Sequence, residues 1–310
     1  MTTEGDAAAA APPGGTTSPV AAAMRRLLAL GGVEAKSRFA YVAGARLHYL
    51  EAGAGEPLVL LQGASGGAAN WYRVLGPLAA HFRVLALDLP GFGLSDPLNV
   101  EAPLGAGGAE VVSAWLGAAA IERCALVGTS LGGLLALRLA QREPGRVRRL
   151  VLLDAVGLGR ELPLLVRCAG LPGLGRLLLR PTRSGTAWLF RRLLTSDRSR
   201  LDAAHQAALI DYLWSSARAG DARGMARAVR RFADPGGQRE VLTDAELEAL
   251  RVPVLVVWGE RDRFVPLAHA LRAAARIPGA ELRILAGVGH SPNWEAPEAF
   301  LAAALAFTRS

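Results

Sequence analysis

Residues 126–133, LVGTSLGG, decide the fold of this chain. The apolar run 123–128 is typical of a buried parallel strand, and residues 131–141 are typical of a buried helix. Between them, Gly128 to Gly132 match G-x-S-x-G, in which a sharp strand-to-helix turn lifts the serine hydroxyl clear of the sheet. A glycine-rich turn can also be purely structural, so the pattern alone only nominates Ser130 as a nucleophile.

Seven further strands are expected around this one. Apolar or alternating runs predict them at 38–44, 46–52, 57–62, 83–88, 148–154, 253–259 and 281–286. Helical patterns occur between most of them, at about 71–80, 109–120, 266–276 and 295–308. Strands that alternate with helices predict an α/β fold, here a mainly parallel eight-stranded sheet with helices on both faces.

The interval 157–250 breaks this alternation, because it has helical patterns and no convincing strand. It is too long for a simple connection, so we interpret it as a helical cap inserted after the sixth strand. The core is then expected at 24–156 and 251–310. The low-complexity residues 1–23 predict a disordered N-terminal tail without the order of a secretory signal.

Arginines lie among leucines between Arg160 and Arg200 of this interval. Two interpretations explain this pattern. The aliphatic stems of the arginines can cover a leucine-packed cap, or the segment can form a face that binds a membrane surface. We favour the first. No charge-free stretch is long enough to cross a bilayer, so we expect no stable membrane insertion.

The composition excludes several classes of protein. The net charge is +8, but the arginines are spread along the chain without an aromatic-interleaved stripe, so no nucleic-acid partner is expected. The two cysteines, Cys124 and Cys168, have neither disulfide nor metal spacing, and a cytoplasmic location is the default. The oligomeric state stays open.

Two further residues complete a candidate catalytic set. A serine hydroxyl needs a base within reach, and the base needs an acid that fixes its tautomer. Asp262 follows the strand 253–259, and His290 follows the strand 281–286. The chain order Ser130, Asp262, His290 is the one that this type of turn calls for.

Alternatives exist for the acid and the base. Glu260 adjoins Asp262, and Asp154 also ends a strand, but the spacing favours Asp262. His290 could instead cap the last helix. The other histidines fall in predicted strands, helices or the cap: His48, His81, His205 and His269.

Acyl transfer also requires donors for the developing oxyanion. The backbone N–H of Leu131, at the start of a helix, is one candidate, and Ala64, in the glycine-rich loop after the strand 57–62, is the other. The aromatic and leucine content of the cap favours an apolar ligand. The candidate substrate-binding residues are Gly63, Ser65, Trp188, Trp214 and Phe264.

Five segments carry a resemblance to a known family: LLQGASGGAANW, DLPGFGLSD, GTSLGG, PVLVVWGERD and GHSPNWEAPEAF. Together they resemble the α/β-hydrolase superfamily, in its alpha/beta hydrolase-1 group with a helical cap. Within it, the chain is similar to esterases and to meta-cleavage-product hydrolases, which cleave C–C bonds. One departure is Gln62 before Gly63, where the family usually has histidine. The serine at position 130 argues against haloalkane dehalogenases and epoxide hydrolases, which have aspartate there.

The resemblance implies a serine hydrolase that needs no metal or organic cofactor. We expect it to cleave a carboxylic ester of a small, largely apolar substrate through an acyl-enzyme. A C–C bond hydrolase of the meta-cleavage-product type is the alternative, and a non-catalytic ligand-binding protein is an alternative of another class.

Overall fold

The structure, a computed structural model, describes residues 18–98, 103–171, 173–220 and 229–309. An eight-stranded sheet forms its centre, in the order β1-β2-β4-β3-β5-β6-β9-β10. β2 runs antiparallel to β1 and to β4, and the other neighbouring pairs are parallel, as predicted. The strands are β1 (Lys36–Val42), β2 (Ala45–Ala52), β3 (Pro57–Leu61), β4 (Arg83–Leu87), β5 (Cys124–Thr129), β6 (Val147–Leu153), β9 (Val254–Gly259) and β10 (Glu281–Leu285).

Each face of the sheet has its own hydrophobic core. In β3, Val59 and Leu61 belong to one core while Leu58 and Leu60 belong to the other, because successive side chains of a strand alternate between faces. The first core is covered by α3 (Leu104–Ala118), α4 (Leu131–Arg142) and α11 (Leu267–Arg276). The second is covered by α1 (Pro19–Leu30), α2 (Tyr72–Ala79) and α13 (Pro297–Arg309). The prediction of helices on both faces is thus confirmed.

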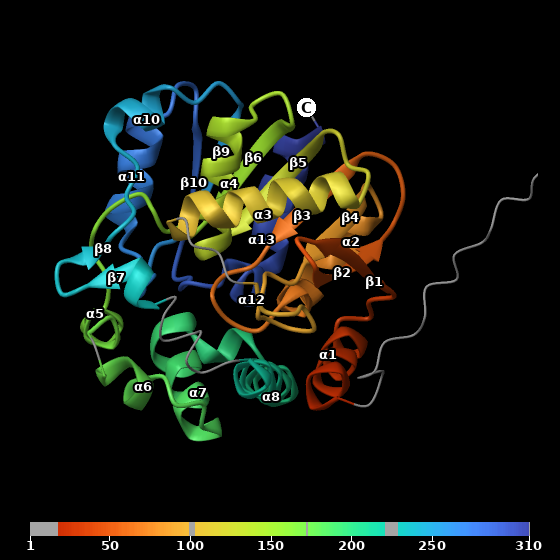
Figure 1. The fold of residues 1–310 in the computed structure, drawn as a ribbon, viewed down its shortest axis with the longest axis vertical. Helices are drawn as coiled ribbons and strands as arrows, with labels where there is room; N and C mark the ends of the chain where they lie inside the picture. The colour runs from red at the N-terminus through yellow and green to blue at the C-terminus, as the bar shows by residue number, and fades with distance from the viewer. Residues whose placement is uncertain (1–17, 99–102, 172, 221–228, 310) are drawn as a thin grey trace, which may run out of the picture.

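The chain between β6 and β9 is mainly helical. Its helices include α5 (Leu164–Ala169), α6 (Leu174–Leu178), α7 (Arg183–Leu189) and α8 (Ala203–Ala219), which lie together at one end of the sheet in Figure 1. A short π-helix, Phe190–Leu194, follows α7, and α10 (Asp244–Glu248) precedes β9. Residues 221–228 of this interval lie outside the described part of the chain.

Two details differ from the expectations for this interval and for the N-terminus. A small hairpin, β7 (Ala233–Asp234) with β8 (Gly237–Gln238), occurs where no strand was expected, because two-residue strands leave no periodic signal. Helix α1 begins at Pro19, inside the expected tail 1–23, and the Ser18 side chain caps it by accepting from the N–H of Ala21. The rest of that segment, residues 1–17, lies outside the described residues.

Among the described residues, none of the helices has both the length and the apolar character that crossing a membrane requires.

Candidate active site

Ser130 occupies a strained turn between β5 and α4. Its φ is +50° and its ψ is −117°, a conformation that residues with a side chain rarely adopt and that costs on the order of 1–3 kcal/mol. Hydrogen bonds hold the turn: the Ser130 N–H donates to the Leu153 carbonyl (3.0 Å), and the Val156 N–H donates to the Ser130 carbonyl (3.1 Å). Neighbouring β6 therefore fixes the backbone of Ser130.

Glycines around Ser130 are required by close backbone approaches. A Cβ at Gly128 would collide with the carbonyl of Gly132, and a Cβ at Gly132 would collide with the carbonyl of Leu61. These contacts bring the start of α4 against β5 and against the end of β3. The small residues of the G-x-S-x-G pattern are thus explained by packing, independently of any chemistry.

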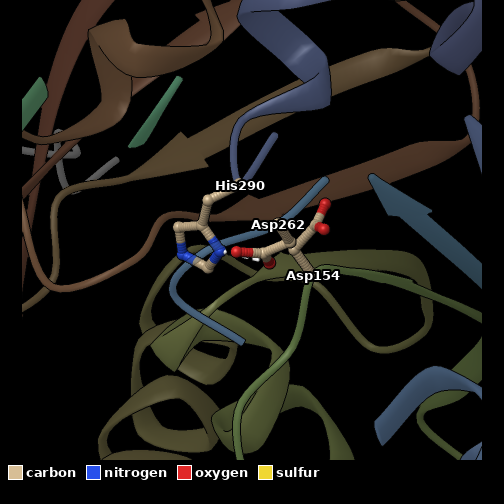
Figure 2. A group of neighbouring side chains, drawn as sticks. All are labelled: Asp154, Asp262 and His290. Atoms are coloured by element: carbon tan, nitrogen blue, oxygen red, sulfur yellow. Dashed lines mark hydrogen bonds and ion pairs between the residues drawn. The ribbon is translucent and has the colours of Figure 1, made fainter. Parts of the chain in front are cut away.

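The imidazole of His290 is joined to the carboxylate of Asp262. Their Nδ1 and Oδ2 atoms lie 2.7 Å apart, and both side chains are buried. Figure 2 shows the other ring nitrogen of His290 facing away from the carboxylate. An Nδ1–H that donates to Asp262 leaves a lone pair on Nε2, which is the tautomer that a general base requires.

Asp262 is held in place by the backbone of its own loop. Its Oδ1 accepts from the N–H groups of Phe264 (2.7 Å) and Val265 (3.0 Å). The rival acid Glu260 points elsewhere, because its carboxylate accepts from the N–H of Gly287 (2.8 Å) at an exposed position. This placement favours Asp262 over Glu260 as the partner of His290.

Three of the other histidines are bound elsewhere. His48 contacts Asp88 (2.7 Å), His205 contacts Asp202 (2.9 Å) and His269 contacts Glu161 (2.7 Å). The fourth, His81, is exposed at the end of α2.

The second rival acid, Asp154, lies directly beside this pair. It is fully buried after β6, and its Oδ1 accepts from the N–H of Gly259 (2.9 Å). Its Oδ2 is buried and receives no hydrogen bond from an N–H or hydroxyl donor of the described residues. Burial raises the pKa of Asp154 well above its ordinary value, and the nearby charge of Asp262 raises that pKa further. Both effects favour a neutral acid whose Oδ2–H donates to Asp262.

Asp154, Asp262 and His290 also need consideration as metal ligands, since one donor atom from each lies within 4.8 Å of the others. In this arrangement, however, the two oxygens of Asp262 are already bound, one to His290 and one to two backbone N–H groups. A carboxylate in this state suits a histidine partner better than a cation.

Gln62 fixes the loop that faces Ser130. The side chain is fully buried at the end of β3. In the amide orientation that satisfies both of its groups, Gln62 donates to the Leu87 carbonyl and accepts from the Leu89 N–H (3.1 Å). The next residue, Gly63, is so close to the nucleophile that a Cβ there would lie 3.0 Å from Ser130 Cβ. The loop after β3 therefore borders the nucleophile, as the oxyanion-hole hypothesis requires.

Comparison with known proteins agrees with this architecture. The sequence profile described as "alpha/beta hydrolase fold" matches residues 56–297. The chain belongs to the α/β-hydrolase family. It is 30% identical to the 2-hydroxy-6-oxo-6-phenylhexa-2,4-dienoate hydrolase of Burkholderia cepacia, over 82% of this chain and 88% of that protein.

Solved structures of the family superpose well on this α/β hydrolase. A bacterial membrane phospholipase A has a TM-score of 0.76 and 26% identity, covering 93% of this chain and 89% of that one. The 2-hydroxy-6-oxo-6-phenylhexa-2,4-dienoate hydrolase of Rhodococcus sp. strain RHA1 also has a TM-score of 0.76 and 26% identity, covering 90% and 100%.

The other predicted site residues of the hydrolase differ in how near they lie to this centre. The Phe264 ring lies 4.8 Å from the His290 ring, centroid to centroid. Trp188 is 49% exposed on α7, and the Arg218 guanidinium lies 5.1 Å from the Trp214 ring centroid. No ring contact or hydrogen bond joins either tryptophan to Ser130, Asp262 or His290 within the described residues.

The predicted site residues in the loop after β3 and at the start of α4 have different surroundings. Ala64 is exposed, and the Ser65 carbonyl accepts from the Asn70 side chain (2.7 Å). Leu131 is the first residue of α4, where backbone N–H groups have no partner within the helix.

Two further contacts around the site were missed at the level of sequence. Ser216 of α8 donates from Oγ to the Gly66 carbonyl (2.5 Å) and accepts from the Gly93 N–H (3.1 Å). The buried carboxylate of Glu295 accepts from the N–H groups of Gly289 (3.0 Å) and Ser196 (2.8 Å). Both link the interval 157–250 to loops that carry site residues, and the only signal in the sequence was Glu295 in the segment GHSPNWEAPEAF.

Among the described residues, His290 is hydrogen-bonded to Asp262, and no hydrogen bond joins its ring to the Ser130 hydroxyl. Catalytic hydrogen bonds of unliganded enzymes are often long and tighten only when substrate binds.

Proposed function

We propose that this α/β hydrolase is a serine hydrolase that cleaves a carboxylic ester of a small, largely apolar molecule. The observation that carries the proposal is the 2.7 Å contact between His290 Nδ1 and Asp262 Oδ2, in a chain that also holds Ser130 in a strained strand-to-helix turn. A buried acid, an oriented imidazole and a projecting hydroxyl are the three groups that acyl transfer needs.

In the proposed acylation step, His290 Nε2 accepts the proton of Ser130 as Oγ attacks the carbonyl carbon of the ester. The carbonyl oxygen becomes an oxyanion, which accepts hydrogen bonds from the N–H groups of Leu131 and Ala64. When the tetrahedral intermediate collapses, the C–O bond of the leaving alkoxide breaks, and His290 returns the proton to that oxygen. Asp262 stabilises the imidazolium throughout the step.

In deacylation, a water molecule replaces the alcohol. His290 removes one proton from the water, whose oxygen attacks the acyl-enzyme carbonyl. Collapse of the second intermediate releases a carboxylic acid and restores the Ser130 hydroxyl. The net reaction adds one water across the ester bond and uses only groups of this chain.

The preference for an apolar substrate is supported by the surroundings of the proposed base. The Phe264 ring lies against His290, and the interval 157–250, which we propose to be the cap, is attached to the loop beside Ser130 through Ser216. Apolar walls with few polar groups are typical of sites for small organic molecules.

A second candidate reaction is hydrolysis of a C–C bond in a dienoate ring-fission product. It is favoured by the 30% identity to the 2-hydroxy-6-oxo-6-phenylhexa-2,4-dienoate hydrolase of Burkholderia cepacia. The name describes the activity of the Burkholderia protein. In this chain, Ser130, Asp262 and His290 would serve either reaction.

Two measurements test these proposals. A fluorophosphonate probe should label the wild type and fail to label Ser130→Ala, whereas absent or equal labelling would favour a non-catalytic ligand-binding protein. Nitrophenyl esters of increasing acyl length should then be compared with a 2-hydroxy-6-oxo-dienoate. Turnover of esters alone supports the first proposal, and turnover of the dienoate with little esterase activity replaces it by the second.

A further inference from the structure

The segment 162–196, which contains α5, α6 and α7, has an unusual composition. It holds six arginines and no aspartate, glutamate or lysine, so its formal charge is +6. Eleven leucines and one tryptophan share the segment with these arginines. Its charge is therefore of one sign, in a chain that otherwise mixes both signs.

Large apolar side chains of this segment are exposed to solvent. Leu164 is 69% exposed, Trp188 is 49% exposed, and Leu171 and Leu178 are also exposed. Single exposed apolar residues are normal on protein surfaces, but a concentration of them within one short stretch marks an interaction site. The other exposed large apolar residues of the described chain are spread over the rest of it: Leu30, Phe39, Tyr41, Leu271 and Ile284.

Several arginines of the segment lack a carboxylate partner. Arg180, Arg191 and Arg192 are exposed and form no ion pair with any described residue. Arg183, in contrast, pairs with Asp211 (2.8 Å). Arginine stems that cover buried leucines would leave the leucines inside, yet Leu164 and Leu178 are outside. The segment thus combines unpaired cations with exposed apolar side chains.

The position of these helices suits contact with a large flat partner. Figure 1 shows α5, α6 and α7 on the periphery of the molecule, at the end of the sheet where α8 also lies. Helix α7 packs on α8, which in turn holds the loop beside Ser130 through Ser216. A surface that binds this face would therefore lie one helix away from the proposed site.

We propose that this face, defined by Leu164, Leu178, Trp188, Arg180, Arg191 and Arg192, docks reversibly on an anionic lipid bilayer. Charge complementarity selects the occupant: unpaired arginines attract anionic headgroups, and the exposed leucines and tryptophan enter the boundary between headgroups and acyl chains. A peripheral face of this kind needs no spanning helix. The proposal does not depend on the proposed function, because it concerns binding alone.

Co-sedimentation with vesicles tests the proposal. The full chain carrying Ser130→Ala, which keeps lipid hydrolysis out of the readout, is mixed with vesicles of phosphatidylglycerol and phosphatidylcholine in equal parts, or of phosphatidylcholine alone. We expect binding to the anionic vesicles at least about tenfold tighter, and loss of most of it near 1 M salt, where the Debye length is about 3 Å. Equal binding to both vesicles, or to neither, would overturn the proposal.

Matched variants locate the binding face. Arg191→Gln with Arg192→Gln should weaken binding about thirtyfold, since each arginine near an anionic surface contributes about fivefold. Arg123→Gln with Arg309→Gln removes two exposed arginines at the opposite end of the sheet. This double variant should change vesicle binding little. Trp188→Ser should weaken binding, while Leu271→Ser, at a residue that is 50% exposed on α11, should not.

Two outcomes would contradict this assignment. Equal losses in the control variants would mean that the net charge, rather than this face, drives binding. A concentration-dependent dimer in light scattering that Trp188→Ser abolishes, without vesicle binding, would instead identify a second copy of the chain as the occupant. Circular dichroism melts of every variant establish that it is folded.

Discussion

The carboxyl groups of Asp154 and Asp262 lie side by side in Figure 2, with oxygen atoms within 4.8 Å of each other. In the chain, 107 residues separate these two aspartates. Asp154 is fully buried with a raised pKa, and Asp262 binds His290. Two adjacent carboxylates cannot both ionise cheaply at this distance. One proton is therefore expected on Asp154, between the two groups.

The first prediction concerns that proton. Asp154→Asn should retain kcat within about threefold, because a neutral amide can donate to Asp262 as a carboxylic acid does. Asp154→Ala removes the donor, and a hydrogen bond to a charged group is worth about 1.5–3 kcal/mol, so kcat should fall about 10- to 100-fold. Steady-state kinetics on the best ester measure both. If Asn were as damaging as Ala, the donor role would be wrong.

The same proton predicts how stability depends on pH. The pKa of Asp154 in the folded state lies above its unfolded value of about 3.8. The protonated side chain therefore makes its full contribution to the free energy of unfolding when the pH is below about 3.8. As the pH rises toward the folded pKa, only the unfolded state loses the proton, and the free energy of unfolding falls by up to about 1.4 kcal/mol per pH unit. Urea unfolding at several pH values should show this slope in the wild type and a shallower one in Asp154→Asn. Parallel curves would contradict the raised pKa.

The identity of the acid gives a third prediction with its own control. Asp262→Asn should lower kcat about 10⁴-fold, the scale found when a triad histidine is held in the wrong tautomer. Glu260→Gln should change kcat less than about twofold, since Glu260 binds an exposed backbone N–H away from His290. A larger effect of Glu260→Gln than of Asp262→Asn would exchange the two roles.

Much of the fold could be predicted because its signals are local. The apolar runs of β3, β5 and β9 are continuous, as expected of strands buried on both faces, and glycines mark the turn at Ser130. The hairpin β7–β8 and the start of α1 were missed, since two-residue strands and an alanine-rich helix resemble loops and low-complexity sequence. Such elements owe their stability to tertiary packing, which sequence periodicity does not report.

The site was only partly predictable for a related reason. Asp262 and His290 follow strand ends, and parallel topology brings strand ends together. Ser216 and Glu295, in contrast, act through backbone groups. Ser216 binds the carbonyl of Gly66, 150 residues away, and Glu295 binds the N–H of Gly289, 6 residues away. No side-chain pattern announces a partner that is a backbone carbonyl or N–H, so the structure was needed to find these contacts.

Gln62 allows a fourth prediction. Gln62→Leu would leave the Leu87 carbonyl and the Leu89 N–H buried without partners, and each such loss costs about 1–3 kcal/mol. The free energy of unfolding should therefore fall by about 2–5 kcal/mol, as urea titration measures. Gln62→His should restore most of it, since imidazole can both donate and accept. No difference between Leu and His would mean that Gln62 only fills space.

Ser216 supplies the last prediction, because it connects α8 to the loop that contains Gly63 and Ala64. Ser216→Ala removes one donor from the Gly66 carbonyl and one acceptor from the Gly93 N–H, which leaves only their mutual hydrogen bond (3.0 Å). The loop, no longer tied to α8 at this point, should shift and present its oxyanion donors less well. We expect kcat to fall about tenfold with KM nearly unchanged, which is the pattern for an interaction made only in the transition state. Ser215→Ala is the matched control, since no described residue hydrogen-bonds the hydroxyl of Ser215, and kcat should stay within about twofold. A rise in KM at constant kcat would instead assign α8 to ground-state binding of substrate, and would contradict a role for Ser216 in placing the oxyanion donors.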